Sequence, residues 1–253
     1  MRRLLTIIKP SRGYSHTFYY VFNILLPFLV LAFVKIELAW LALGIILLSK
    51  WRMFAVRPRF WLANVRANAV DVIIGLSALA FVIDSSSTWM QLLWVALWVI
   101  WLIYIKPATD TLWVSLQAFV GLVAGLIALF VIWDSGPLVG LVLAAGAICF
   151  FAAHHFFDGF EEPHSRLLAL LWGYFGAGLT WILSHWLLFY GPVAQSALIL
   201  SALGFGIGTI YYLDHFDKLS VNTKRQFIFI MIAVVLLILA YSDWSNKVVG
   251  GGV

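Results

Sequence analysis

Charged side chains are scarce in this chain of 253 residues. Asp, Glu, Lys and Arg make up 11% of the sequence, whereas they make up about 25% of a typical soluble domain. Apolar residues reach 64%, and the mean hydropathy is +1.01. A chain of this composition folds in lipid, and its length leaves no room for a sizeable soluble domain. We therefore expect a single integral membrane domain over residues 1–253.

Cysteine and buried charge are almost missing as well. Cys149 is the single cysteine and lies inside an apolar run, which excludes an intramolecular disulfide and a Cys-x-x-Cys metal site. The ionisable residues of the apolar runs are Asp71, at the edge of one run, and His185, near the end of another. Proton pumps and ion-coupled carriers need buried charge, so the sequence argues against both classes. Carriers of neutral or lipophilic molecules stay open.

What the sequence does contain is a series of long apolar runs. A helix needs about 20 apolar residues to cross the hydrocarbon core of a membrane. No small-residue cleavage site follows the first run, which we interpret as a retained span rather than a signal peptide. The sequence predicts an all-α fold, a polytopic transmembrane helical bundle of nine spans. The predicted spans are 18–34, 36–49, 69–83, 89–105, 111–133, 138–153, 167–190, 193–213 and 227–241.

The first two runs leave two interpretations open. Lys35 and Glu37 mark their junction, but neither Gly nor Pro does, so one long helix and a total of eight spans is the alternative. A hairpin places fourteen of the sixteen Lys and Arg residues on one side of the membrane. Cytoplasmic loops are enriched in these residues, so the charge distribution favours the hairpin, a cytoplasmic N-terminus and an extracytoplasmic C-terminus. A bacterial cytoplasmic (inner) membrane is the simplest location for such a chain.

The same pattern predicts the organisation of the chain. A helical hairpin (18–49) comes first and is followed by a basic interfacial segment (50–68), the main helix bundle (69–241) and a flexible outer tail (242–253). The interfacial segment alternates arginine with aromatic residues, as expected of a helix that lies among lipid headgroups. We expect membrane lipids, including anionic headgroups, as partners, and no nucleic acid, because the cationic loops are short and lie against the membrane. The predicted headgroup contacts are Arg52, Arg57, Arg59, Trp61 and Arg66.

Two further patterns concern contacts of the spans. Asn64, Asn68 and Asp71 follow one another at helical spacing, and this polar stripe either binds a headgroup or polar substrate or satisfies neighbouring helix ends. Trp94, Trp98 and Trp101 form an aromatic stripe along the span at 89–105. Lipid-facing tryptophans lie at the membrane interface, but Trp98 is deep for that position. The stripe therefore indicates a hydrophobic groove or a contact with another helix, a membrane-protein partner or a second copy of the chain.

Two predicted cytoplasmic loops concentrate the remaining polar chemistry. The loops after the spans at 138–153 and 193–213 hold four of the six histidines and five of the eleven acidic residues. Imidazole and carboxylate together suit zinc, iron or manganese, so the cluster predicts a divalent-metal or acid–base site. A structural interpretation is the alternative. Pro163 suits the first turn of a helix, and the helix dipole stabilises acidic residues such as Glu161 and Glu162 at a helix start. The candidate ligands are His154, His155, Asp158, His164, Asp214, His215 and Asp217.

The string from Glu161 to Arg166, Glu-Glu-Pro-His-Ser-Arg, resembles the EExxxR motif of the CAAX-protease and bacteriocin-processing family of intramembrane hydrolases. The resemblance implies that Glu161 activates a water molecule, with two downstream histidines assisting. The sequence departs from the family at Trp181 and Leu219, where the family has Phe and Asn or Asp. A straight helix would also place one of the histidines about 30 Å from Glu161. The catalytic candidates are Glu161, Glu162, Arg166, His185 and His215.

The sequence alone favours a non-enzymatic membrane protein, either a structural or assembly subunit or a carrier of lipophilic cargo. The alternative is an intramembrane hydrolase, metal-dependent or similar to the CAAX-protease family, that uses the His and carboxylate cluster. A composite site requires that the loops after the spans at 138–153 and 193–213 touch in the folded chain.

Overall fold

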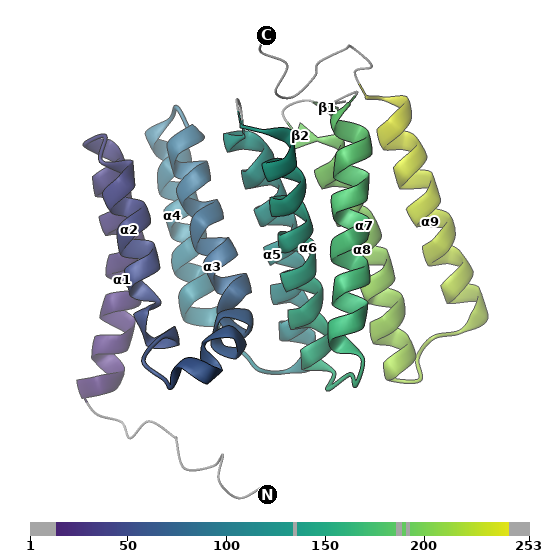
Figure 1. Cartoon of the computed structure of the whole chain (residues 1–253), viewed down its shortest axis with the longest axis horizontal. Coiled ribbons are helices and arrows are strands. Elements are labelled where there is room, and N and C mark those ends of the chain that lie inside the picture. Colours follow the sequence, from purple (N-terminus) through teal and green to yellow (C-terminus); the bar gives the residue numbers. More distant parts are fainter. Residues whose placement is uncertain (1–13, 134–135, 186–188, 191–192, 243–253) are drawn as a thin grey trace, which may run out of the picture.

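The computed structural model is a bundle of helices that stand side by side, and it describes residues 14–133, 136–185, 189–190 and 193–242 (Figure 1). Consecutive helices run in opposite directions. The helices are α1 (Tyr14–Lys35), α2 (Ala39–Ser49), α3 (Trp61–Asp84), α4 (Thr88–Ile100), α5 (Thr111–Ile132), α6 (Leu138–Gly159), α7 (Ser165–Ser184), α8 (Gln195–His215) and α9 (Val221–Ala240). Shorter elements are the 3₁₀ turns η1 (Trp51–Met53) and η2 (Pro58–Phe60), the π-helical turn η3 (Trp101–Ile105), and the antiparallel strands β1 (Phe189–Tyr190) and β2 (Val193–Ala194).

Seven helices of the described residues are long and apolar enough to cross a membrane. They are α3 together with η2, α4 together with η3, and α5 to α9. Two shorter apolar helices precede them, Tyr20–Lys35 of α1 and Ala39–Ser49, which is α2. The 11 residues of α2 make about 16 Å of helix. The helical structure and its seven long apolar helices fit an integral membrane protein, whereas the predicted count of nine spans is not confirmed.

The first two apolar runs form two helices rather than one. Helix α1 ends at Lys35, and α2 packs against it in the opposite direction (Figure 1). Glu37 has a left-handed backbone with φ 62°, and the amide of Leu38 donates to the carbonyl of Phe33 over 2.8 Å. This closing pattern ends a helix sharply without the glycine that usually stands there. The hairpin predicted from the charge distribution is therefore present in the fold.

The antiparallel order brings the loops 50–60, 106–110, 160–164 and 216–220 to the same end of the bundle (Figure 1). We call it the basic end, because nearly all described Lys and Arg residues lie in these loops or in adjoining helix turns. They are Lys50, Arg57, Arg59, Arg66, Lys106, Arg166, Lys218, Lys224 and Arg225, while Lys35 lies at the opposite end. Arg2, Arg3, Lys9, Arg12 and Lys247 lie outside the described residues, as does the side chain of Arg52.

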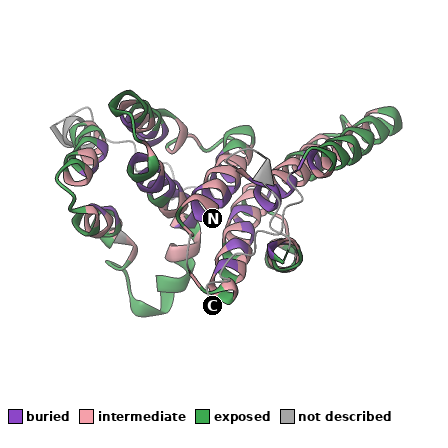
Figure 2. Ribbon diagram, turned by 90° about the horizontal axis from the view of Figure 1, so that it is seen from above, coloured by how far each residue is buried: buried purple, intermediate pink, exposed green. Residues whose placement is uncertain are grey.

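Two apolar clusters form the interior. One joins α1, α2, α3, α4 and η3 around residues such as Ile46 and Trp98, and the other joins α5, α6 and α8 around Leu126 and Leu200. Large apolar side chains are also exposed along the outward helix faces, as expected where lipid replaces water (Figure 2). Helices α6 and α7 approach closely where glycine replaces a side chain: a Cβ added to Gly146 would lie 3.0 Å from that of Ala177.

Several predicted boundaries are wrong at the membrane edges. Helix α3 begins at Trp61 and takes up part of the predicted interfacial segment, since Pro58 starts the helix earlier than the apolar run does. Helix α6 continues to Gly159, so His154, His155 and Asp158 are helical rather than in a loop. Helix α7 ends at Ser184, and the last two residues of its predicted span form strand β1, which pairs with β2 at the start of the next predicted span.

Candidate functional site

A cavity of about 630 Å³ lies between α5, α6, α7 and α8 at the basic end. Its walls are mainly aliphatic and aromatic, with Phe119 from α5, Phe156 from α6, Trp172 from α7 and Phe205 from α8 among them. Two of the lining residues, Leu171 and Phe205, expose 58% and 54% of their surface. The cavity therefore reaches the apolar flank of the bundle between α7 and α8, where lipid would surround the protein.

Glycines of α8 make room for this cavity. Gly204 and Gly208 both line it and lie one helical turn apart. A Cβ added to Gly204 would lie 2.7 Å from a methyl group of Leu122, so this glycine lets α8 approach α5. A Cβ added to Gly208 would make an ordinary van der Waals contact with the ring of Phe156, at 3.7 Å, so this position accepts a Cβ without a clash. Gly208 is thus a place where a larger side chain would enter the cavity.

Polar groups gather at the mouth of the cavity on the basic end. The hydroxyl of Tyr211, a lining residue, donates a hydrogen bond of 2.5 Å to Oε2 of Glu162. This hydrogen bond holds the pKa of Glu162 below its ordinary value. The ring of Phe160 is buried and contacts the ring of His215 with centroids 4.9 Å apart. The loop after α6 therefore contacts the last turn of α8, beside the cavity.

The predicted metal ligands are spread over different surfaces of these elements. Nδ1 of His154 lies 3.0 Å from a carboxylate oxygen of Asp158, whereas Nε2 of His155 lies 2.9 Å from the amide oxygen of Gln117. Asp217 stands in a left-handed turn with φ 54° at the end of α8. Within the ranges that the structure describes, no three His, Cys, Asp or Glu residues converge in a way that could hold a metal ion. His164 directly precedes α7 and Asp214 lies in the last turn of α8, and neither joins such a group among the described residues.

The residues of the hydrolase-like motif are separated along α7. Glu161 is exposed at the basic end, and its φ of 53° makes it the left-handed residue that ends α6. His185 caps the far end of α7, where its Nδ1 lies 2.8 Å from the carbonyl of Trp181. The 20 residues of α7 separate the two by about 30 Å. Arg166 is exposed in the first turn of α7, and only His215 lies near the glutamates.

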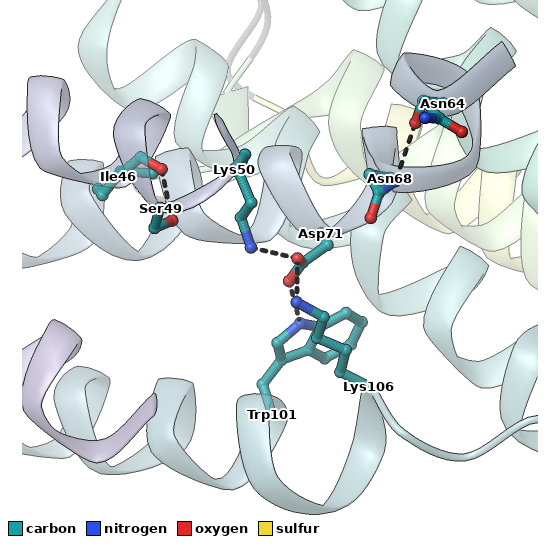
Figure 3. A network of polar contacts seen from close by, with 8 residues as sticks. All are labelled: Ile46, Ser49, Lys50, Asn64, Asn68, Asp71, Trp101 and Lys106. Carbon is teal, nitrogen blue, oxygen red and sulfur yellow. Dashed lines mark hydrogen bonds and ion pairs between the residues drawn. The ribbon is translucent and has the colours of Figure 1, made fainter. Parts of the chain in front are cut away.

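A second polar site at the basic end surrounds Asp71 (Figure 3). Its Oδ2 pairs with Lys50 and, at 2.6 Å, with Nζ of Lys106, while Oδ1 accepts a 3.3 Å hydrogen bond from Nε1 of Trp101. Sequence reasoning singled out Asp71 but missed both lysines. The signal was an isolated acid in an apolar run, which in a membrane protein calls for a named partner.

The other residues of the polar stripe bind backbone. Nδ2 of Asn64 donates to the carbonyl of Met53 over 3.2 Å, and Nδ2 of Asn68 donates to the carbonyl of Asn64 over 2.9 Å. The Asn64 bond fixes the loop before α3, as do the two that Trp61 donates to carbonyls of the same loop, whereas the Asn68 bond lies within α3. Among the predicted headgroup contacts, Arg57 and Arg59 are exposed and Arg66 is half-buried.

The tryptophan stripe of α4 faces the protein. Trp98 and Trp101 are each 4% exposed and belong to the apolar cluster of the N-terminal helices. Trp94 stacks on Phe81 of α3 with ring centroids 4.6 Å apart, and its indole donates to the hydroxyl of Ser85 over 3.1 Å. The stripe thus joins α4 to α3 within one chain.

The cavity, its polar mouth and the ion cluster at Asp71 all lie at the basic end, where four loops converge. A ligand of the cavity would be apolar in its main part and polar at one end. Comparisons with protein-family models, with curated proteins and with solved structures found no match.

Proposed function

We propose that the protein binds a lipophilic molecule in the cavity between α5, α6, α7 and α8, as a non-enzymatic carrier or lipid-binding subunit of the membrane. The cavity of about 630 Å³ carries this proposal. Small-molecule sites in proteins commonly measure about 300–1,000 Å³ and are mostly apolar with a few polar groups. The lining of this cavity has that composition.

The distribution of polar groups supports an occupant with a long apolar body and a polar end. Apolar side chains line the body of the cavity, and the Tyr211–Glu162 pair lies at its mouth. An acyl or isoprenoid chain would enter between Leu171 and Phe205 directly from the bilayer, because both are exposed on the apolar flank. Such a ligand would leave no buried polar group without a partner, which keeps the cost of binding low.

The orientation in the membrane belongs to the same proposal. The basic end would face the cytoplasm, with the N-terminus on that side and the C-terminus on the other, in a bacterial cytoplasmic membrane. The gathering of Lys and Arg at one end of the bundle supports this orientation. The polar mouth of the cavity would then lie at the level of the inner-leaflet headgroups.

The test is to narrow the cavity at Gly208. Gly208→Leu adds a branched side chain to the space beside Phe156 without a backbone clash. The affinity of the purified protein for a fluorescent fatty acid is measured from the fluorescence change on binding, and displacement by the unlabelled fatty acid shows that the binding is specific. We expect about tenfold weaker binding, a change that corresponds to roughly 1.4 kcal/mol.

The matched control is Gly178→Leu in α7. A Cβ at Gly178 would meet no atom within 4 Å, and this glycine does not line the cavity. We expect this variant to bind the fatty acid with the affinity of the unaltered chain. Equal affinity of both leucine variants would remove the cavity as the binding site.

A further inference from the structure

The ion cluster at Asp71 joins three elements that are distant in sequence. Lys50 directly follows α2, Asp71 lies in α3, and Lys106 directly follows η3 (Figure 3). Both ammonium groups contact the same carboxylate oxygen. Lys50 and Asp71 expose 10% and 9% of their side chains, so most of the cluster is out of contact with solvent.

The cluster carries an excess positive charge. Two ammonium groups face one carboxylate, and the described residues supply neither lysine with a second acidic partner. Burial lowers the pKa of Lys50, and the nearby charge of Lys106 lowers it further, while Asp71 opposes the change. Removing an ion from water costs several kcal/mol unless its charge is compensated. The site is therefore one anion short of neutrality.

Both lysines keep hydrogen-bond donors for such an anion. An ammonium group has three N–H donors, and the bond to Asp71 occupies one of them in each lysine. Lys106 exposes 31% of its side chain, which provides access from the surface at the basic end. A phosphate group brings negative charge and several acceptor oxygens, so it matches the donors and the charge together.

The π-helical turn η3 positions Lys106 for this role. The amide of Lys106 donates to the carbonyl of Trp101 over 2.8 Å, five residues back. In a regular α-helix two residues five apart point about 140° from one another. The wider turn instead lets Trp101 and Lys106 reach the two oxygens of the same carboxylate. Such turns often mark functional positions in helices.

We propose that Lys50 and Lys106, held by Asp71, form a binding site for a phosphate group at the basic end of the bundle. The group belongs either to the headgroup of an anionic phospholipid or to a soluble phosphate. This inference rests on the ion cluster and is independent of the cavity.

The test measures thermal stability of delipidated protein in a neutral detergent. Phosphatidylglycerol, phosphatidylcholine and inorganic phosphate are added separately to the unaltered chain and to Lys106→Gln, which retains the Lys50–Asp71 pair. We expect saturating phosphatidylglycerol to raise the Tm of the unaltered chain by about 5 °C. In Lys106→Gln the rise falls to half or less.

The matched control is Lys218→Gln, at the same end of the bundle. Lys218 is exposed, lies over the ring of Phe216 and makes no ion pair within the described ranges. The substitution Lys218→Gln removes the same charge as Lys106→Gln, and the variant should keep the full rise in Tm with phosphatidylglycerol. Lys106→Arg should keep most of it, because a cation with free donors remains.

The lipid and phosphate arms identify the source of the group. If phosphatidylglycerol raises the Tm, Lys106→Gln reduces that rise to half or less, and inorganic phosphate produces no rise, the site is supported and its ligand is a lipid. If inorganic phosphate raises the Tm and Lys106→Gln reduces that rise to half or less, the site is supported and its ligand is a soluble phosphate. If Lys106→Gln shows the full rise of the unaltered chain with every addition, the site does not exist.

Discussion

At the basic end, the role of an individual residue depends on its contacts and cannot be predicted from its residue type alone. Glu162 belongs to the hydrolase-like string, yet in the fold it accepts a hydrogen bond from Tyr211 and ties the loop after α6 to α8. Asp71 belongs to the polar stripe, yet it differs from Asn64 and Asn68 in pairing with two lysines. A carboxylate in a chain so poor in charge is thus explained by its partners.

The two lysine partners of Asp71 could not be predicted from the sequence, for a physical reason. Residues 50, 71 and 106 meet only because the ends of α2 and η3 lie beside the first half of α3, and nothing local couples them. Periodicity predicts which residues follow one another on a helix, as it did for Asn64, Asn68 and Asp71 of α3. Contacts between helices depend on packing, which the hydropathy pattern does not encode.

The Tyr211–Glu162 hydrogen bond predicts a pH dependence of stability. The pKa of Glu162 is lower in the folded chain than its ordinary value of 4.5. The folded state therefore gains stability above that value and loses it as the pH falls through the folded pKa. In Tyr211→Phe, which lacks the donor, we expect a smaller fall in Tm between pH 6 and pH 3 than in the unaltered chain.

Tyr212→Phe is the control for this measurement. Tyr212 also lines the cavity, but within the described residues its hydroxyl has no hydrogen-bond partner. It should show the same acid-dependent fall in Tm as the unaltered chain. Identical pH profiles for all three proteins would mean that the hydrogen bond does not shift Glu162.

Among the elements, helix ends depart most from expectation. The hydropathy pattern marks where lipid surrounds a helix, but α3 and α6 continue beyond that zone into polar sequence. The chain ends α1, α6 and α8 in the same way, with an acidic residue in a left-handed backbone at Glu37, Glu161 and Asp217. Each is followed by an amide that reaches back five residues. Glycine usually marks this kind of helix end, so without it the sequence did not predict where these helices end.

These left-handed acidic residues predict a gain in stability on substitution by glycine. A side chain in this backbone region costs about 1–2 kcal/mol, and glycine avoids most of that cost. We expect Glu161→Gly to raise the Tm by about 2–4 °C in a chain of this size. Thermal unfolding in detergent, followed by circular dichroism, measures the change.

Glu161→Ala separates backbone strain from the loss of charge. It removes the same carboxylate but keeps a Cβ at a φ of 53°, so it should leave the Tm unchanged or lower it. A rise of equal size in both variants would assign the effect to charge and not to the backbone.

For the whole molecule, the charge distribution predicted more than any motif did. It required a hairpin at the start of the chain, and α1 and α2 form one. It also required that the basic loops share one end, which the antiparallel order of the helices provides (Figure 1). The hydropathy pattern does not fix the number of spans, because α2, with 11 residues, is shorter than the hydrocarbon thickness of about 30 Å requires.

The orientation of the bundle is the last prediction, and the lone cysteine makes it simple to test. Cys149 is fully buried in α6, so the unaltered chain should react little with a membrane-impermeant maleimide. Ser86 and Lys218 are exposed at opposite ends of the bundle. If the basic end faces the cytoplasm, Ser86→Cys is labelled in intact cells, because its loop lies outside. Lys218→Cys is then labelled only after the cells are permeabilised, and the reverse pattern would invert the topology.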